Sequence, residues 1–137
     1  MKTKTIQGYM DLDYVVLVNI PVRQTKEFGE IIDISETEIE RRVCEELIRQ
    51  RAPLRGREIL TLRKGLSLSL EKMGAKLEIS GTTIQRWEKE KDKRQEHFTE
   101  AALRSFFAEE YKVDIRGWYR ELTPSHNVEA VTIKFAA

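Results

Sequence analysis

The chain has 137 residues, with 24 Lys and Arg against 23 Asp and Glu and a formal net charge of +1. A chain of this length can bury a real hydrophobic core, which predicts one domain or one domain with an appended arm. No segment approaches the roughly 20 consecutive apolar residues of a membrane span, and no apolar run follows the N-terminal lysines as in a secretory signal. The single cysteine, Cys44, excludes an intrachain disulfide and a multi-cysteine zinc site. The sequence therefore predicts a cytoplasmic protein without membrane contact.

Two β-rich segments and one helical pattern occupy the first 50 residues. Residues 14–18 (YVVLV) are β-branched or apolar and predict a strand that ends at Pro21, and residues 30–34 predict a second strand. A two-stranded unit is marginal alone, so this hairpin or small sheet must pack on something. The capping box at residues 35–38 (SETE) opens a predicted helix that reaches about Gln50.

Three short helices with tight connections are predicted in the middle of the chain. The apolar spacing predicts helices over residues 57–64 and 69–77 and a third that begins at Ser80, followed by a charged exit over residues 89–94. Further along, Thr99 is predicted to cap another helix. This helix carries an aromatic stripe that is typical of a core or dimer contact.

The C-terminal segment ends in a predicted turn and strand. A turn is expected at residues 123–127, and residues 128–135 alternate apolar and polar side chains as a strand does. This strand is expected to pair either with residues 14–18 or with its mate across a dimer.

Charge is unevenly distributed along the chain. Residues 55–94 hold eleven Lys or Arg and six acids, a net charge of +5, whereas residues 1–54 and 95–137 each carry a net −2. A local surplus of this size favours a polyanionic partner, although solvated helix faces often look similar.

The second and third short helices have the layout of a helix-turn-helix. The second of these two helices, the recognition helix, must enter a major groove about 12 Å wide, so its first residues must be short or able to donate hydrogen bonds. Residues 80–83 (SGTT) meet that requirement, and Gln85 and Arg86 can reach base edges or phosphates one turn on. Ser69 offers a hydroxyl to a phosphate at the start of the preceding helix. An ordinary helical bundle with polar caps is the alternative.

Residues 62–91, LRKGLSLSLEKMGAKLEISGTTIQRWEKEK, resemble the helix-turn-helix of the Xre/Cro-type repressors without gaps. The matching positions are Leu62-Arg63-Lys64, Leu66, Leu68-Ser69, Ile79-Ser80, Thr83-Ile84 and Arg86-Trp87-Glu88. The DNA-binding residues that the resemblance implies are Ser69, Ser80, Gly81, Thr82, Thr83, Gln85, Arg86, Lys89 and Lys91. Among them, the two lysines are expected to act through charge alone.

Several positions depart from the family pattern or have two interpretations. Glu78 stands at the usual turn glycine, where a positive φ is costly for any other residue. Leu70 replaces a glutamine that contacts phosphate, and Gly81 removes one base-reading side chain. Arg86 could contact guanine or pair with Glu90 on the same helix, and the DNA contact is favoured.

The resemblance extends upstream to the MqsA-type antitoxins, in which a zinc ribbon precedes the helix-turn-helix. It is carried by LDYVVLVNIPV, by Gly29-Glu30, by an intervening helix and by PLRGREILTLRK. The positions of one cysteine pair of that family hold Thr25 and Phe28, and zinc needs about four N or S ligands. The resemblance therefore implies a metal-free remnant of the ribbon, with no cofactor.

These observations predict a mainly α fold, with a lambda-repressor-like helix-turn-helix domain and small β elements at both ends. The expected units are a small α/β unit over residues 1–53, the DNA-binding domain over residues 54–112 and a β arm over residues 113–137. The expected function is a sequence-specific DNA-binding transcriptional regulator, a repressor that reads a palindromic operator as a homodimer. The alternative is an antitoxin that neutralises a toxin protein and autoregulates its operon. The sequence has no nucleophile elbow, phosphate loop or metal cluster, so no catalytic residue and no enzyme activity are expected.

Overall fold

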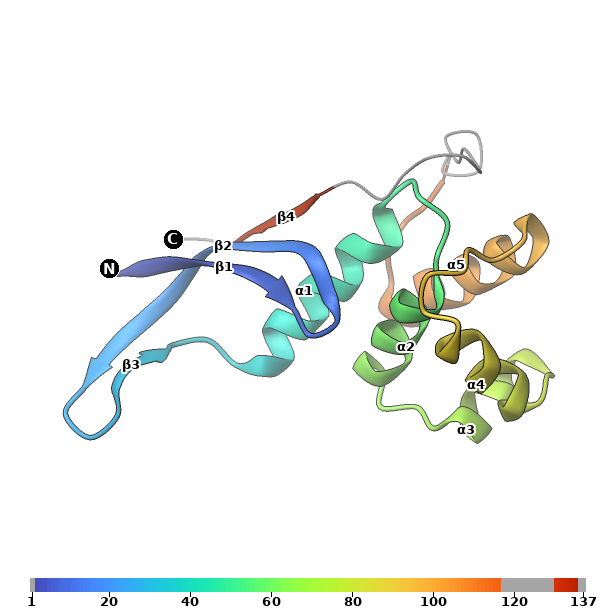
Figure 1. The fold of residues 1–137 in the computed structure, drawn as a ribbon, viewed down its shortest axis with the longest axis horizontal. Coiled ribbons are helices and arrows are strands. Elements are labelled where there is room, and N and C mark those ends of the chain that lie inside the picture. The colour runs from blue at the N-terminus through green and yellow to red at the C-terminus, as the bar shows by residue number, and fades with distance from the viewer. Residues whose placement is uncertain (1, 117–129, 136–137) are drawn as a thin grey trace.

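A computed structural model describes residues 2–116 and 130–135 of the chain. Five helices pack beside a four-stranded sheet in these ranges (Figure 1). The elements are β1 (Thr3–Tyr9), β2 (Leu12–Thr25), β3 (Gly29–Ile32), α1 (Glu36–Arg49), α2 (Gly56–Gly65), α3 (Leu70–Leu77), α4 (Gly81–Lys89), α5 (His97–Tyr111) and β4 (Val131–Lys134). The prediction of a mainly α fold is wrong, because about 46% helix and 26% strand make this an α/β fold.

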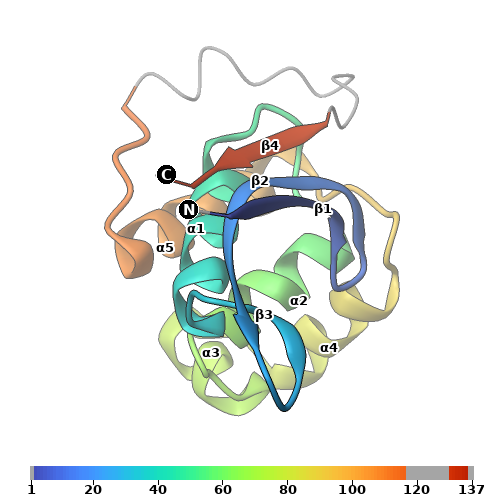
Figure 2. The same cartoon turned by 90° about the vertical axis from the view of Figure 1, so that its left-hand side faces the viewer.

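The long strand β2 organises the sheet. β1 runs antiparallel along it, β3 pairs antiparallel with its C-terminal end, and β4 pairs parallel with residues 15–18. Of the two partners expected for the C-terminal strand, the structure shows the one within the same chain. Figure 2 shows this sheet lying in front of the helices, with β2 between β1 and β4. The turn expected at residues 123–127 lies outside the described residues.

The predicted end of the first strand at Pro21 is wrong, because β2 continues to Thr25. Proline lacks an N–H, but its carbonyl oxygen accepts a 2.8 Å hydrogen bond from the backbone N–H of Asp33. The register with β1 shifts nearby, where Asn19 has a φ of 61°. On β2, residues 15–18 pair with β4 and residues 22–25 pair with β3. Pro21 therefore lies between the part of β2 that pairs with β4 and the part that pairs with β3, so its missing N–H donor does not end the strand.

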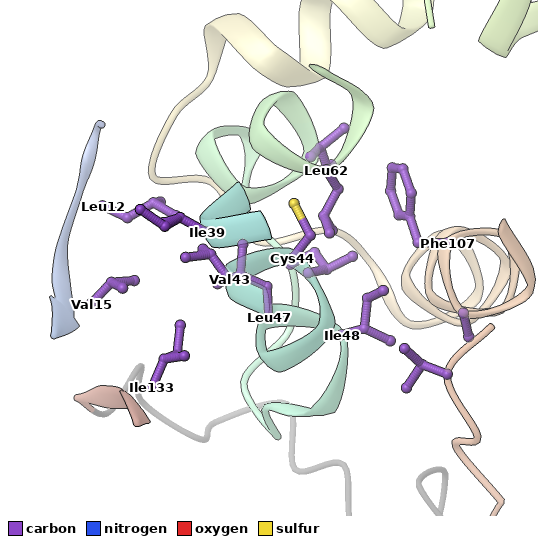
Figure 3. Packing of buried hydrophobic residues seen from close by; sticks show 14 of the residues in the cluster. Leu12, Val15, Ile39, Val43, Cys44, Leu47, Ile48, Leu62, Phe107 and Ile133 are labelled. Carbon is purple, nitrogen blue, oxygen red and sulfur yellow. The ribbon is translucent and has the colours of Figure 1, made fainter. Parts of the chain in front are cut away.

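Helix α1 lies between the sheet and the other helices and carries the centre of the core (Figure 1). Figure 3 shows Val43 and Leu47 of α1 facing Val15 and Ile133 of the sheet, with Phe107 of α5 on the other side. All five side chains are buried, and burial of an apolar side chain of this size contributes about 1.5–3 kcal/mol. The core is continuous across the expected boundaries at residues 53 and 112.

A buried arginine ties α5 to the connection between α1 and α2. Arg104 is fully buried and donates hydrogen bonds to the carbonyl oxygens of Ile48 (2.7 Å) and Ala52 (2.9 Å) and to the Glu100 carboxylate. The second oxygen of Glu100 accepts a 2.8 Å bond from the backbone N–H of Leu54. Arg104 and Glu100 of α5 thereby fix the backbone of the segment that leads into α2.

The start of α5 also differs from the expected one. The helix begins at His97, and Glu96 occupies the N-cap position that was expected at Thr99. The Thr99 hydroxyl bonds to the Glu96 carboxylate at 3.3 Å.

No helix in the described ranges is both long enough and apolar enough to cross a bilayer.

Candidate nucleic-acid interface

Helices α3 and α4 are the two helices in which the sequence predicts a helix-turn-helix, and a serine caps each of them. The hydroxyl of Ser69 accepts a 3.0 Å hydrogen bond from the backbone N–H of Lys72, and the hydroxyl of Ser80 accepts a 3.0 Å bond from that of Thr82. These caps satisfy backbone donors that the first turn of a helix otherwise leaves unpaired. A hydroxyl that accepts a bond can still donate one, so both serines can also meet a phosphate oxygen.

The turn between the two helices takes the conformation that a glycine would take. Glu78 has φ 58° and ψ 39°, in the left-handed region, and ends α3. The backbone N–H of Ile79 then donates a 2.9 Å bond to the carbonyl oxygen of Gly74, as in a helix C-terminal cap. Glu78 therefore stands where the Xre/Cro-type pattern has a glycine, and the tight turn is kept.

Two glycines allow α3 and α4 to approach closely. A Cβ on Gly74 would lie 2.6 Å from the carbonyl oxygen of Ile79, and one on Gly81 would lie 3.1 Å from the backbone of Leu70. Any side chain at position 81 would thus point at the first turn of α3. Gly81 supports the packing of the two helices, so its expected role in DNA binding is limited to its backbone.

Helix α4 divides into a buried face and an exposed face. Ile84 and Glu88 are buried, whereas Thr82, Gln85, Arg86 and Lys89 are exposed. Residues three or four apart share one side of a helix, so Thr82 lies on the same side as Gln85 and Arg86, and Lys89 continues that side one turn on. Thr83 is half-buried at the edge of this face. The structure therefore brings four of the predicted DNA-binding residues onto one side of one helix.

A shallow groove runs from this exposed face to the first turn of α3. It has a volume of about 530 Å³, and Thr82 and Gln85 line one side, opposite Leu70 and Glu71. Ser69 directly precedes that wall. The groove therefore separates Thr82 and Gln85 from the first turn of α3, at whose start Ser69 is expected to contact a phosphate.

Most of the basic side chains between residues 55 and 94 are neutralised within the protein. Six of these eleven side chains form ion pairs in the described residues, namely Arg55–Glu58, Arg57–Asp92, Arg63–Glu88, Lys76–Glu110, Lys91–Asp11 and Lys93–Glu90. Within the described part of the chain, Arg86 and Lys89 have no ion-pair partner. The alternative pairing of Arg86 with Glu90 is not formed, since the Glu90 carboxylate lies 3.1 Å from Lys93.

Lys91 differs from the other expected DNA contacts. It lies beyond the end of α4, and its Nζ is 3.4 Å from a carboxylate oxygen of Asp11 in the β1–β2 turn. Arg57, at the start of α2, also contacts Asp11. Sequence reasoning missed Asp11 and Arg57, because nothing local in the sequence indicates that residues so far apart meet here.

The positions that correspond to the missing cysteine pair close a turn by hydrogen bonding. The Thr25 hydroxyl donates a 2.9 Å bond to the carbonyl oxygen of Gly29 and accepts a 3.0 Å bond from the backbone N–H of Phe28. Among the residues that the structure describes, no group of three or more His, Cys, Asp or Glu is placed to hold a metal ion. A hydroxyl thus closes the β2–β3 turn at the positions that correspond to a cysteine pair of the MqsA-type antitoxins.

Comparison with known proteins finds no matching family model, no matching curated protein and no matching solved structure.

Proposed function

We propose that this protein is a sequence-specific DNA-binding transcriptional regulator, a cytoplasmic repressor with α4 as its recognition helix. The observation that carries the proposal is Arg86, which is exposed and without an ion-pair partner in the described residues, whereas the guanidinium groups of Arg55, Arg57 and Arg63 are paired. An unpaired guanidinium on a fixed helix can donate to a polyanion or a base edge without first breaking an internal salt bridge. The resemblance to the Xre/Cro-type repressors supports the same assignment.

The exposed face of α4 has the chemistry that major-groove reading needs. An arginine such as Arg86 can donate two hydrogen bonds to O6 and N7 of guanine, and a glutamine such as Gln85 can pair with N6 and N7 of adenine. Thr82 can present its methyl group to thymine. Ser69 and Lys89 would contact phosphates, which fix the register of the protein on the duplex.

The proposal includes a homodimer. A helix-turn-helix dimer reads half-sites about 34–36 Å apart, so two copies of Arg86 would be presented at that spacing on a palindromic operator.

Selection from a randomised duplex pool tests the proposal without a known operator. The wild-type chain is expected to enrich a two-fold symmetric sequence, because two copies of α4 read two half-sites. Arg86→Ala is expected to enrich no sequence or a relaxed one. Lys26→Ala is the matched control, since it removes one exposed positive charge from the β2–β3 turn, far from α4 in the chain. Equal enrichment of the same DNA sequence by Arg86→Ala and the wild type would count against the proposed role of Arg86 on the recognition helix.

The second candidate function, an antitoxin, is favoured by a groove on the N-terminal unit. This groove of about 550 Å³ is lined by Ile6, Met10 and Ile32 and by the carboxylates of Glu36 and Glu40. Met10 is 69% exposed and Ile32 is 42% exposed. Exposed apolar side chains beside acids fit a partner protein with an apolar contact surface and basic side chains.

Co-expression with the product of a neighbouring toxic reading frame tests this second function. The wild-type chain and Arg86→Ala should both restore growth, because α4 is not part of the groove. Met10→Glu should fail to restore growth, and Phe28→Glu, at an exposed position that does not line the groove, should restore it. Rescue by Met10→Glu would exclude the groove as the toxin-binding surface.

A further inference from the structure

The turn between β1 and β2 places a carboxylate beside the exit of the proposed recognition helix. One carboxylate oxygen of Asp11 lies 3.4 Å from Nζ of Lys91 and 3.3 Å from Nη1 of Arg57. The same Nη1 donates a 2.9 Å hydrogen bond to the backbone carbonyl oxygen of Asp11. Nη2 of Arg57 bonds to Asp92 at 2.6 Å. Asp11 is therefore held by Arg57 and faces Lys91.

The two cations beside Asp11 differ in their freedom. The Arg57 side chain is 18% exposed and fixed by hydrogen bonds, whereas the Lys91 side chain is 57% exposed and pairs in the described residues with Asp11 alone. The backbone of Lys91 is anchored, because its carbonyl oxygen accepts a 3.2 Å bond from the N–H of Arg57. The ammonium group of Lys91 can thus move while its backbone stays fixed two residues beyond the exposed Lys89 of α4.

We propose that the carboxylate of Asp11 competes with DNA phosphate for Lys91, so that this residue of the N-terminal hairpin sets how tightly the protein holds DNA. The inference rests on the proposed DNA-binding function and adds a determinant of affinity outside the helix-turn-helix. When Lys91 turns to a phosphate, its contact with Asp11 is lost, and Arg57 is the ion-pair partner that the carboxylate keeps.

The magnitude of the effect follows from the exposure of the pair. Asp11 is 46% exposed, and exposed ion pairs contribute about 0–1 kcal/mol, so DNA can displace the carboxylate at a modest cost. Removal of that competition is expected to raise duplex affinity about threefold to fivefold at low salt. Because Lys91 would then engage a phosphate more fully, the slope of log affinity against log salt is expected to steepen, by up to about 0.9 for one phosphate.

Fluorescence anisotropy with a mixed-sequence DNA duplex at low salt tests the inference. Asp11→Asn is expected to bind about threefold to fivefold more tightly than Asp13→Asn, which removes the same charge from an exposed side chain that forms no ion pair in the described residues. The gain should disappear in the Lys91→Ala background. Thermal melting of each variant shows that the fold is kept.

The outcomes separate the inference from the function on which it rests. If all variants bind DNA and Asp11→Asn equals Asp13→Asn, or if the gain persists without Lys91, the inference is wrong while DNA binding stands. If the wild-type chain binds no duplex at any salt concentration, the proposed function fails and the inference fails with it.

Discussion

Arg63 of α2 donates two hydrogen bonds to Glu88 of α4, at 2.6 Å from Nε to Oε2 and at 2.9 Å from Nη2 to Oε1. The side chains are only 12% and 7% exposed, so this ion pair is largely shielded from water. The hydrogen bonds to Glu88 raise the pKa of Arg63 above its ordinary value. Nη1 of Arg63 also bonds to the carbonyl oxygen of Leu68 at 2.8 Å. One guanidinium thus fixes both the loop before α3 and the proposed recognition helix.

Removal of one partner of this pair should destabilise the protein strongly. Glu88→Ala leaves the Arg63 guanidinium buried without its carboxylate, which is expected to lower the free energy of unfolding by about 3 kcal/mol. Urea unfolding followed by circular dichroism measures this change. Glu110→Ala, which breaks the more exposed pair with Lys76, should cost less than about 1 kcal/mol. Equal losses in the two variants would show that the Arg63–Glu88 pair does not anchor α4.

The buried Arg104 gives the second prediction. Arg104→Met keeps much of the apolar volume but leaves the carbonyl oxygens of Ile48 and Ala52 and the Glu100 carboxylate without their donor. Each unsatisfied buried group costs about 1–3 kcal/mol, so this variant is expected to fold poorly or not at all. Arg116→Met, at an exposed position, should melt close to the wild type. Normal melting of Arg104→Met would refute the structural role of Arg104.

Some of the fold could be predicted from local sequence patterns. The capping serines and the apolar spacing located α1, α3 and α4 correctly, because both features act within one or two helical turns. Strand β1 was not predicted, since its sequence TKTIQGY is largely polar and it forms an outer strand of the sheet with mostly exposed or half-buried side chains. That missed strand and the extension of β2 past Pro21 account for much of the error in fold class.

The site was predictable only where its residues are neighbours in the sequence. The exposure of Gln85 and Arg86 and the burial of Ile84 followed from their spacing on one helix. The ion pairs that neutralise other cations of this segment include contacts between distant parts of the chain, such as Lys91 with Asp11 and Arg63 with Glu88. Arg104 gave no local indication of burial, because its carbonyl partners lie 52 to 57 residues away in the chain.

The strained turn between α3 and α4 gives a prediction of increased stability. Glu78 has a φ of 58°, which is costly for a residue with a Cβ, so Glu78→Gly is expected to stabilise the protein by about 0.5–1 kcal/mol. Differential scanning calorimetry measures the shift. Glu71→Gly, within α3, should destabilise by a similar amount, because glycine loses more backbone entropy in a helix. A lower melting temperature for Glu78→Gly would contradict the role assigned to this conformation.

The buried thiol gives a prediction of chemical reactivity. Burial raises the pKa of Cys44 from its ordinary 9.0 to about 11, so the thiol stays protonated in the folded protein at pH 8. Ellman's reagent should therefore label the native protein far more slowly than the urea-unfolded protein.

The sign of the linked pH effect follows from the direction of that shift. A thiol pKa that is higher in the folded state contributes stability that is complete below about pH 9 and is lost as the pH rises toward about 11. Native labelling should accelerate over the same interval. Rapid labelling of the native protein at pH 8 would show that Cys44 is accessible and not buried in the core.

The central claim, that α4 reads DNA, is tested most directly by titrating salt against the affinity of the wild-type chain for its selected duplex. We expect log affinity to fall linearly with log salt, by about 0.9 for each phosphate contacted. Lys89→Ala should flatten this slope by about one unit, and Arg86→Ala should abolish the preference for the selected duplex over a scrambled one. Absence of duplex binding by the wild-type chain even at the lowest salt concentration would contradict the account.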